Sequence, residues 1–283
     1  MKDLSHLSNR SRIGVMRLII AVAVLTACSG GGSSDDGGTK SDTGSASDSG
    51  APDSSSDGSA SDSPSEASTK TCTSPVFTTS DPNGGQTFGK YYLHNDMWNT
   101  QQTLGPQTLY VCNFDNWYAV SNQKDQQGAV LTYPNVHEDF ADVALNTFKT
   151  ITSSFAESSP HVGIYEDAYD IWFNGFGQGH TELMIWVDNE KQVPSGNKQA
   201  TQAFSGHTYD AYRTSDGSYI ALVATANFTS GTIDLLEVFN WVVSKGWLAS
   251  NAPLSQIDFG IEIVDTAGAP ATYTVTDFSI TSN

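Results

Sequence analysis

Glu182 occupies a stretch in which a carboxylate lies among large apolar side chains. The stretch reads HTELMIWV. As a β-strand it would place His180, Glu182, Met184 and Trp186 on one face and Leu183, Ile185 and Val187 on the other. An ionised group beside such side chains needs water or polar partners. We therefore expect Glu182 to line a wet aromatic cleft, and an isolated surface position is the alternative.

Two later stretches show the same division of faces. In Tyr169 to Asn174 the carboxylate face would carry Asp170, Trp172 and Asn174. In Ile257 to Val264 it would carry Asp258, Gly260, Glu262 and Val264. These faces combine carboxylates with Trp and Met and contain no nearby Lys or Arg, which suits a groove that stacks sugar rings.

Paired carboxylates in such a groove predict glycoside hydrolysis. Retaining hydrolysis needs two carboxyl groups about 5–5.5 Å apart, one to attack the anomeric carbon and one to protonate the leaving oxygen. Two like charges at that separation keep one carboxyl protonated at neutral pH. The pattern favours a glycosidase, and a non-catalytic carbohydrate-binding sandwich is the alternative.

The elements that must position these residues are short strands. Residues 72 to 283 alternate apolar runs with Gly, Pro, Asn, Asp and Ser turns, which predicts an all-β sandwich or barrel. The clearest expected strands are 91–94, 107–111, 129–132, 169–173, 182–187, 219–224, 257–264 and 272–280.

One segment, from Thr232 to Lys245, has apolar residues near helical spacing. Asp234 stands near its start and Lys245 and Gly246 near its end, as the helix macrodipole and a glycine stop favour. We expect a single scaffold helix packed on the outside of the sandwich.

The N-terminus has the features of an export signal. Arg10, Arg12 and Arg17 precede an apolar run that ends in Leu25-Thr26-Ala27-Cys28, which resembles a bacterial lipoprotein signal. The resemblance implies a signal peptide over 1–27 and lipid attachment to Cys28. A transmembrane anchor is the alternative, but the run is shorter than the about 20 apolar residues that a spanning helix needs.

A tether is expected between the signal and the domain. Residues 28–71 are almost all Gly, Ser, Asp, Ala and Thr after the cysteine, so they cannot bury enough apolar surface to offset chain entropy. A binding tail is the weaker alternative, because the acidic residues are dispersed and form no block. The implied location is extracellular or at the cell surface, with the membrane contacted only through the lipid.

The charge of residues 72–283 limits the partners. The chain has 31 acidic and 13 basic residues, of which 9 and 6 precede residue 72, leaving 22 and 7 and a net charge near −15. Nucleic acid and anionic surfaces are excluded as partners, because binding a polyanion requires positive charge. We expect a neutral polysaccharide as substrate and a monomeric protein.

The remaining cysteines, Cys72 and Cys112, form an even count in an exported domain, which favours one disulfide. Their spacing makes no zinc motif, since no His pair stands at ligand spacing. We expect no metal and no organic cofactor. His137, His161, His180 and His207 are scattered, and we expect turn or surface positions for them.

Several motifs together resemble glycoside hydrolase family 12, the β-jelly-roll endoglucanases and xyloglucanases. They are, in chain order, YYLHNDMW (91–98), LTYPN (131–135), YEDAYDIWF (165–173), TELMIW (181–186) and FGIEI (259–263). They keep the family's order and span nearly all of residues 72–283. The resemblance implies a jelly-roll sandwich with a concave substrate cleft.

The resemblance also implies roles. Glu182 would be the nucleophile, Glu262 the acid/base, and Asp170 a carboxylate that tunes the nucleophile, with a strand-end structural role as its alternative. Trp98 would stack on a sugar. Further cleft residues would be Asp96, Asn135, Trp172, Met184 and Trp186, for which core packing (the tryptophans and Met184) or turn chemistry (Asn135) is the alternative.

The chain departs from the family at four places. Asp96 replaces the second Asn of the Asn-Asn-x-Trp pattern, so an acceptor replaces a hydrogen-bond donor. The connection 174–179 is short and glycine-rich, and Ile263-Val264-Asp265 stands where many members carry an aromatic residue. The Cys72–Cys112 spacing is also wider than the family's early disulfide suggests.

These observations predict a retaining endoglucanase that cleaves internal β-1,4 bonds of glucans. Xyloglucan or mixed-linkage β-glucan is the alternative substrate, since loop shapes decide the tolerance of branches. A glucan-binding surface lipoprotein without turnover is the alternative from another class.

Overall fold

The computed structural model describes residues 71–283. The predicted signal peptide (1–27), the predicted lipidation site Cys28 and all but the last residue of the predicted tether lie outside the described residues. Within residues 71–283 no helix has the length and apolar character needed to cross a membrane.

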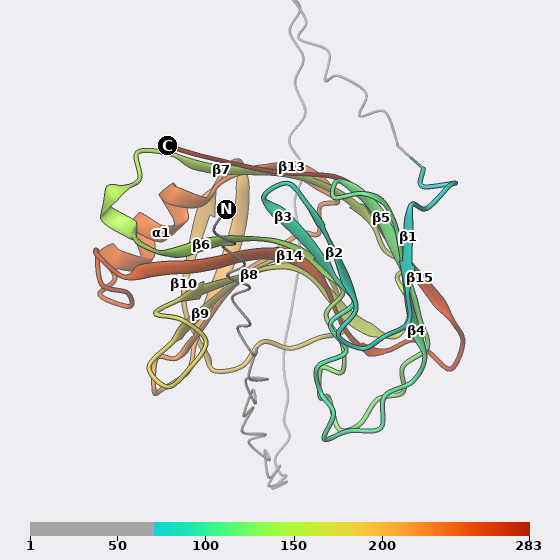
Figure 1. Cartoon of the computed structure of the whole chain (residues 1–283). Coiled ribbons are helices and arrows are strands. Elements are labelled where there is room, and N and C mark those ends of the chain that lie inside the picture. The colour runs from blue at the N-terminus through green and yellow to red at the C-terminus, as the bar shows by residue number, and fades with distance from the viewer. Residues whose placement is uncertain (1–70) are drawn as a thin grey trace, which may run out of the picture. The chain divides into compact units, whose positions relative to one another are not determined.

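The described residues form a β-jelly-roll sandwich of two sheets (Figure 1). The six-stranded sheet contains, in spatial order, β1 (Phe77–Thr79), β4 (Gln107–Asn113), β5 (Asn116–Ser121), β15 (Ala271–Ser282), β7 (Ile151–Ser158) and β13 (Ser230–Asp234). The nine-stranded sheet contains β10 (Asn197–Phe204), β11 (His207–Arg213), β12 (Tyr219–Ala224), β9 (Thr181–Glu190), β8 (Ile164–Phe173), β14 (Pro253–Asp265), β6 (Asn135–Ala144), β3 (Tyr91–His94) and β2 (Gly85–Phe88).

The core lies between the two sheets and contains one face of each strand. The apolar faces predicted for β8, β9 and β14 all join it, so the period-two prediction is confirmed on these strands. Ring contacts cross the interface, as between Phe155 of β7 and Phe259 of β14, whose centroids lie 4.9 Å apart. The opposite face of the nine-stranded sheet, which carries Glu182, Asp170 and Glu262, is called the carboxylate face below.

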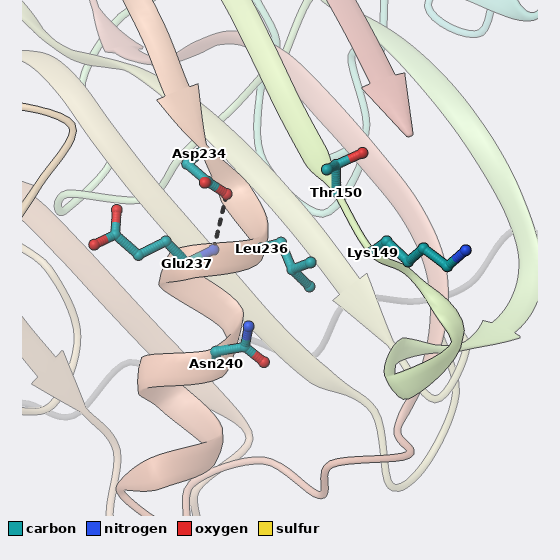
Figure 2. Close-up of a pocket in the computed structure, with 6 residues that line it drawn as sticks. All are labelled: Lys149, Thr150, Asp234, Leu236, Glu237 and Asn240. Carbon is teal, nitrogen blue, oxygen red and sulfur yellow. Dashed lines mark hydrogen bonds between the residues drawn. The ribbon is translucent and has the colours of Figure 1, made fainter. Parts of the chain in front are cut away.

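One α-helix, α1 (Leu235–Ser244), packs its apolar side against this core, within the segment predicted to be helical. The Asp234 side chain caps its N-terminus by accepting a hydrogen bond from the backbone N–H of Glu237 (Figure 2). Gly246 ends the helix in a left-handed conformation (φ 70°). The short 3-10 turn η1 (Leu145–Thr147) connects β6 to β7.

Three local predictions are wrong. Residues 129–132 form no strand, because Pro134 interrupts the line of β6 and leaves Thr132 as a single bridge to Ile263. Asn174 lies beyond the end of β8 in a left-handed turn and is exposed, so it leaves the carboxylate face. His137 is not a turn or surface residue, because it lies inside β6 and is buried.

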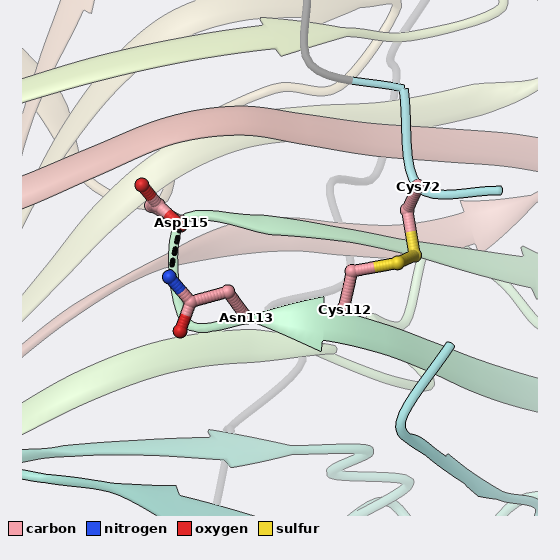
Figure 3. Close-up of a disulfide and its surroundings, with 4 residues drawn as sticks. All are labelled: Cys72, Cys112, Asn113 and Asp115. Carbon is pink, nitrogen blue, oxygen red and sulfur yellow. Dashed lines mark hydrogen bonds between the residues drawn. A yellow bond between two sulfur atoms is a disulfide. The ribbon is translucent and has the colours of Figure 1, made fainter. Parts of the chain in front are cut away.

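Cys72 and Cys112 form a disulfide, as the even cysteine count predicts (Figure 3). The Cα atoms lie 5.6 Å apart. Cys112 lies in β4, and Val76 donates a backbone hydrogen bond to Val111 of the same strand at 2.8 Å. The bridge therefore fastens the chain just before the three-residue edge strand β1 to its neighbour β4.

Candidate active site

The centre of the carboxylate face is a row of residues that face one another across five strands. Pairing aligns Met184 of β9 with Asp170 of β8, then Asp258 of β14, His137 of β6 and Tyr92 of β3. Directly paired residues point to the same face of a sheet. Asp170 and Asp258 are therefore neighbours, and both are buried.

Glu182 lies next to this row, toward the start of β9. It is half-buried, and it faces Trp172 of β8 on one side and Tyr219 of β12 on the other. Trp172 is buried against the rings of Phe176 and His180, whose centroids lie 5.4 and 5.2 Å away. His180 itself precedes the strand, which begins at Thr181.

Glu262 lies beyond the other side of the row, where β14 pairs Glu262 with Glu166 of β8. Both are buried, with 6% and 1% of their surfaces exposed. Burial raises the pKa of Glu166 well above its usual value, and the charge of Glu262 and a hydrogen bond with it raise that pKa further. Two buried carboxyl groups in this relation share a proton at neutral pH.

Glu182 and Glu262 do not face each other directly in the pairing. Strand β8 separates their strands, and their partners on it, Trp172 and Glu166, are six positions apart. Strand twist and the reach of the side chains must therefore bring the two carboxyl groups toward one another.

The Tyr219 phenol interacts electrostatically with several of these carboxylates. Burial raises its pKa well above the usual value, and the charges of Glu182, Glu262, Glu166 and Asp170 raise it further, in that order. The Tyr219 hydroxyl donates to Met184 Sδ at 3.3 Å, so the ring extends over β9. A phenol in this field stays protonated and can only donate or accept hydrogen bonds at neutral pH.

Met184 and Trp186 form the base of the carboxylate face. They are buried in a small cluster with Ala168 and Ala221, separate from the main core, and Tyr219, Tyr212 and Val223 pack on it. Trp186 Nε1 donates to Met184 Sδ at 3.4 Å. Both side chains thus lie on the predicted face, and both are also as buried as core residues.

Asn135 links the residues predicted at the sugar-binding end of the face. Its amide nitrogen donates to the Tyr133 carbonyl at 2.8 Å and to Asp96 Oδ2 at 3.4 Å, and its Oδ1 lies 2.9 Å from His137 Nδ1. Asp96, the departure from the family pattern, is therefore an acceptor for Asn135. Trp98, two residues after Asp96 in the chain, is half-buried.

Glu166, Tyr219 and His137 are site residues that the sequence interpretation did not identify, and Asp258 was placed on the carboxylate face without a role. Strand alternation places Glu166 on the same face as Asp170, since every second residue from Asp170 leads through Ala168 to Glu166. His137 Nδ1 lies 3.6 Å from Asp258 Oδ1, an ion pair when the ring is protonated. Tyr219 joins the site through the parallel pairing of β12 with β9, which the sequence does not reveal.

A pocket of about 330 Å³ lies away from these carboxylates, beside the N-terminus of α1. Figure 2 shows its lining, which comes from the helix, its N-cap and the two residues before β7: Lys149, Thr150, Asp234, Leu236, Glu237 and Asn240. Asp234 is already used as the helix cap. The pocket offers no buried carboxylate pair, so we place the candidate chemistry on the carboxylate face.

Comparisons with known proteins agree on one family. The family model described as Glycosyl hydrolase family 12 matches residues 89–283. Endoglucanase S of Pectobacterium parmentieri is 24% identical over 204 residues, covering 62% of this chain and 76% of that protein. The protein named Inactive glycoside hydrolase XLP1, from Phytophthora nicotianae, is 26% identical over 210 residues, covering 69% of this chain and 87% of that protein.

A solved structure shows the same fold. The xyloglucanase domain of NopAA from Sinorhizobium fredii, in complex with cellobiose, aligns with a TM-score of 0.65 and 24% identity. The alignment covers 74% of this chain and 100% of that chain.

Proposed function

The chain belongs to glycosyl hydrolase family 12, and from this premise we propose that it is a retaining endo-β-1,4-glucanase with Glu182 as nucleophile and Glu262 as acid/base. The observation that carries the proposal is the Tyr219 phenol, which lies in the combined field of Glu182 and Glu262 on one face of the sheet. A buried face with several carboxylates and aromatic side chains suits a neutral sugar chain.

The reaction would proceed in two displacements. Glu182 attacks the anomeric carbon and forms a glycosyl ester, while Glu262 gives its proton to the departing glycosidic oxygen. Glu262 then takes a proton from water, the resulting hydroxide oxygen attacks the anomeric carbon, and the Glu182 carboxylate leaves. The Glu166–Glu262 pair would keep a proton available for the first step.

The remaining carboxylate-face residues would hold the substrate and the nucleophile. Asp170 is diagonal to Glu182, two residues along β8 from Trp172, which pairs directly with Glu182, so we propose that Asp170 orients and tunes the nucleophile. Trp98 would stack on a sugar ring, and Asn135 with Asp96 would contact hydroxyl groups. Trp172, Met184 and Trp186 would support this surface from below.

We propose a β-1,4-linked glucan as the substrate class, and the support is the neighbouring xyloglucanase domain solved in complex with cellobiose. Cellulose-like glucan is our first choice. Xyloglucan or mixed-linkage β-glucan is the alternative, since that neighbour is a xyloglucanase domain.

A glucan-binding protein without turnover is the second candidate function. It is favoured by the relative that is named inactive and by the burial of Glu262, Met184 and Trp186. Retention of both Glu182 and Glu262 favours the enzyme, because binding alone needs no carboxylate pair.

Release of reducing ends distinguishes these functions. Wild-type protein is assayed on carboxymethylcellulose, barley β-glucan and xyloglucan, beside Glu182→Gln and Glu262→Gln. We expect turnover by the wild type and a loss of about 10²–10⁴-fold or more in each variant. Glu237→Gln, on the exposed side of α1, is the matched control and should keep full activity. Binding of the glucans with no release by the wild type would establish the second candidate.

We also propose that Cys28 carries a lipid that tethers a monomeric enzyme to the cell envelope. The support is the arginine-rich start, the short apolar run and the Leu-Thr-Ala-Cys site. Labelling with radioactive palmitate should depend on Cys28, and equal labelling and processing of Cys28→Ala would refute the tether.

A further inference from the structure

We propose that Glu157, Asp167 and Asp188 form a binding site for a divalent cation, with Ca²⁺ as the preferred ion, on the side of β8 opposite to the carboxylate face. One oxygen from each of the three carboxylates lies within 4.8 Å of the other two. Glu157 comes from β7 of the six-stranded sheet, whereas Asp167 and Asp188 come from β8 and β9 of the other sheet. A cation here would join the two layers of the sandwich.

The local strand geometry explains why the two aspartates meet. Asp167 lies between Tyr165 and Tyr169 on the core face of β8. Asp188 should alternate onto the carboxylate face after Trp186, but Asp167 pairs with Asp188 while Ala168 pairs with Trp186. Val187 is thus the extra residue of a β-bulge, which turns Asp188 to the side of Asp167.

The three carboxylates are buried with several of their oxygens unsatisfied. They are 6%, 0% and 0% exposed for Glu157, Asp167 and Asp188. Neither oxygen of Glu157, nor Oδ2 of Asp167, has a hydrogen-bond partner within residues 71–283. Ser159 donates its one hydroxyl proton to Asp167 Oδ1 at 3.0 Å, so that proton does not satisfy Glu157. Unpaired ionised groups are very unfavourable in such an environment.

Two tyrosine hydroxyls lie beside the carboxylates, and one of them, that of Tyr273, provides a separate indication of a missing partner. The Tyr273 hydroxyl is fully buried and has no hydrogen-bond partner among the described residues, and the charge of Asp167 adds to the effect of burial in raising its pKa. The Tyr165 hydroxyl lies 3.4 Å from Asp188 Oδ2. Together with Ser159 they offer neutral oxygens around three anionic ones, and oxygen is the donor that Ca²⁺ prefers.

The charges around the carboxylates do not balance without an added cation or protons. Within residues 71–283 no Lys or Arg forms an ion pair with them. His161 Nδ1 lies 3.7 Å from Asp188 Oδ2, but its side chain is 54% exposed. Asn227 donates to Asp188 and is neutral. Protonation is the competing explanation, since burial and the charge of Asp188 raise the pKa of Glu157 to about 8.

The donor set fits Ca²⁺ better than Mg²⁺ or Zn²⁺, because all three charged ligands are carboxylate oxygens. Ca²⁺ takes six to eight oxygen ligands at about 2.3–2.6 Å in a flexible geometry. Mg²⁺ retains several waters, and Zn²⁺ prefers nitrogen and sulfur ligands. The sequence predicts no metal site, because the spacing of its cysteine and histidine residues matches no metal-binding motif. These carboxylates, 10 and 21 residues apart in the chain, form no such motif.

Direct binding measurements test the site. Purified protein is treated with EDTA, dialysed, and titrated with Ca²⁺ by calorimetry and with Tb³⁺, whose luminescence nearby tyrosines sensitise. We expect one ion per chain and, at Ca²⁺ about 100-fold above Kd, a rise in Tm of roughly 5–10 °C. Mg²⁺ at the same concentration should have a much smaller effect.

Variants keep the test specific. Glu157→Gln and, separately, Asp167→Asn should lose the Tb³⁺ signal and the Ca²⁺-dependent shift in Tm, while Glu237→Gln retains both. If Asp167→Asn fails to fold, Glu157→Gln and the wild-type titration still show whether Ca²⁺ binds at these carboxylates. Absence of Ca²⁺ binding and of any shift in wild-type Tm overturns the proposal in favour of protons. An equal effect of Mg²⁺, or an unchanged effect in Glu157→Gln, overturns it as well.

Discussion

Glu262 and Glu166 face each other on neighbouring antiparallel strands, with 6% and 1% of their surfaces exposed. The proposed acid/base therefore has a buried carboxyl group as its direct cross-strand neighbour. Two such groups do not ionise independently. The first proton is lost readily and the second is held, so the pair titrates as one unit with two apparent pKa values.

Replacing Glu166 should change the pH dependence of catalysis. The pKa of Glu166 is raised, so the pair retains a proton above the usual range of a carboxylic acid. Gln at 166 carries no charge, so the like-charge effect on Glu262 disappears and its proton is lost at lower pH. We expect the alkaline limb of the kcat/KM profile in Glu166→Gln to move down by about one pH unit or more. An unmoved limb, with the Glu237→Gln profile as reference, would show that Glu166 does not hold the proton.

The stereochemistry of the first product tests the separation of Glu182 and Glu262. The pairing offsets the two residues along the sheet, so the closeness that retention requires depends on twist and side-chain reach. Double displacement predicts that proton NMR detects the β-anomer first, with the α-anomer appearing only through mutarotation. An initial α-anomer would indicate a wider pair that activates water directly, and would exclude Glu182 as a covalent nucleophile.

The Tyr219 hydroxyl should assist catalysis without acting as a base. It stays protonated in the field of the surrounding carboxylates and donates to Met184 in the free enzyme. Tyr219→Phe removes this donor and keeps the ring, so we expect a loss of about 10–150-fold in kcat/KM, equal to one hydrogen bond to a charged group. Tm should change little. A full loss of activity with a lowered Tm would instead identify Tyr219 as a packing residue for Met184 and Trp186.

Much of the fold follows from local patterns. Strict alternation in β8, β9 and β14 predicts which residues enter the core, because only one face of each strand can be buried against the other sheet. Strands such as β6 and β10 were not predicted, since their apolar residues do not alternate as clearly. The bulge at Val187 breaks the period and depends on the pairing of β9 with β8, so no local pattern contains it.

From the sequence, the site can be predicted only to the extent that alternation within one strand shows which of its residues share a face. Period two places Glu182, Asp170 and Glu262 on one face, but the sequence does not state which strands are neighbours. The pairing of β8 with β14 brings Glu166 to Glu262, and the parallel pairing of β12 with β9 brings Tyr219 to Glu182. For the same reason the carboxylates of Glu157, Asp167 and Asp188 become a cluster only in three dimensions.

The Cys72–Cys112 disulfide should stabilise the sandwich without affecting catalysis. It closes a loop of 40 residues, and the chain-entropy estimate for such a loop is a stabilisation of at most about 4 kcal/mol. The bridge joins the segment before β1 to β4, and both strands belong to the six-stranded sheet, whereas the carboxylate face belongs to the other sheet. The Cys72→Ser/Cys112→Ser double variant should therefore unfold at lower urea concentration, with kcat at 25 °C unchanged.

Two comparisons make this expectation specific. Wild-type protein in a reducing agent should reproduce the urea midpoint of the double variant, because both lack the same covalent bond. Hydrogen exchange should increase first at the amides of β1, since only three residues pair this edge strand with β4 once the bridge is gone. If both cysteines react with a thiol reagent in the native, unreduced protein, the bond is absent and residues 72–76 are held by backbone contacts alone.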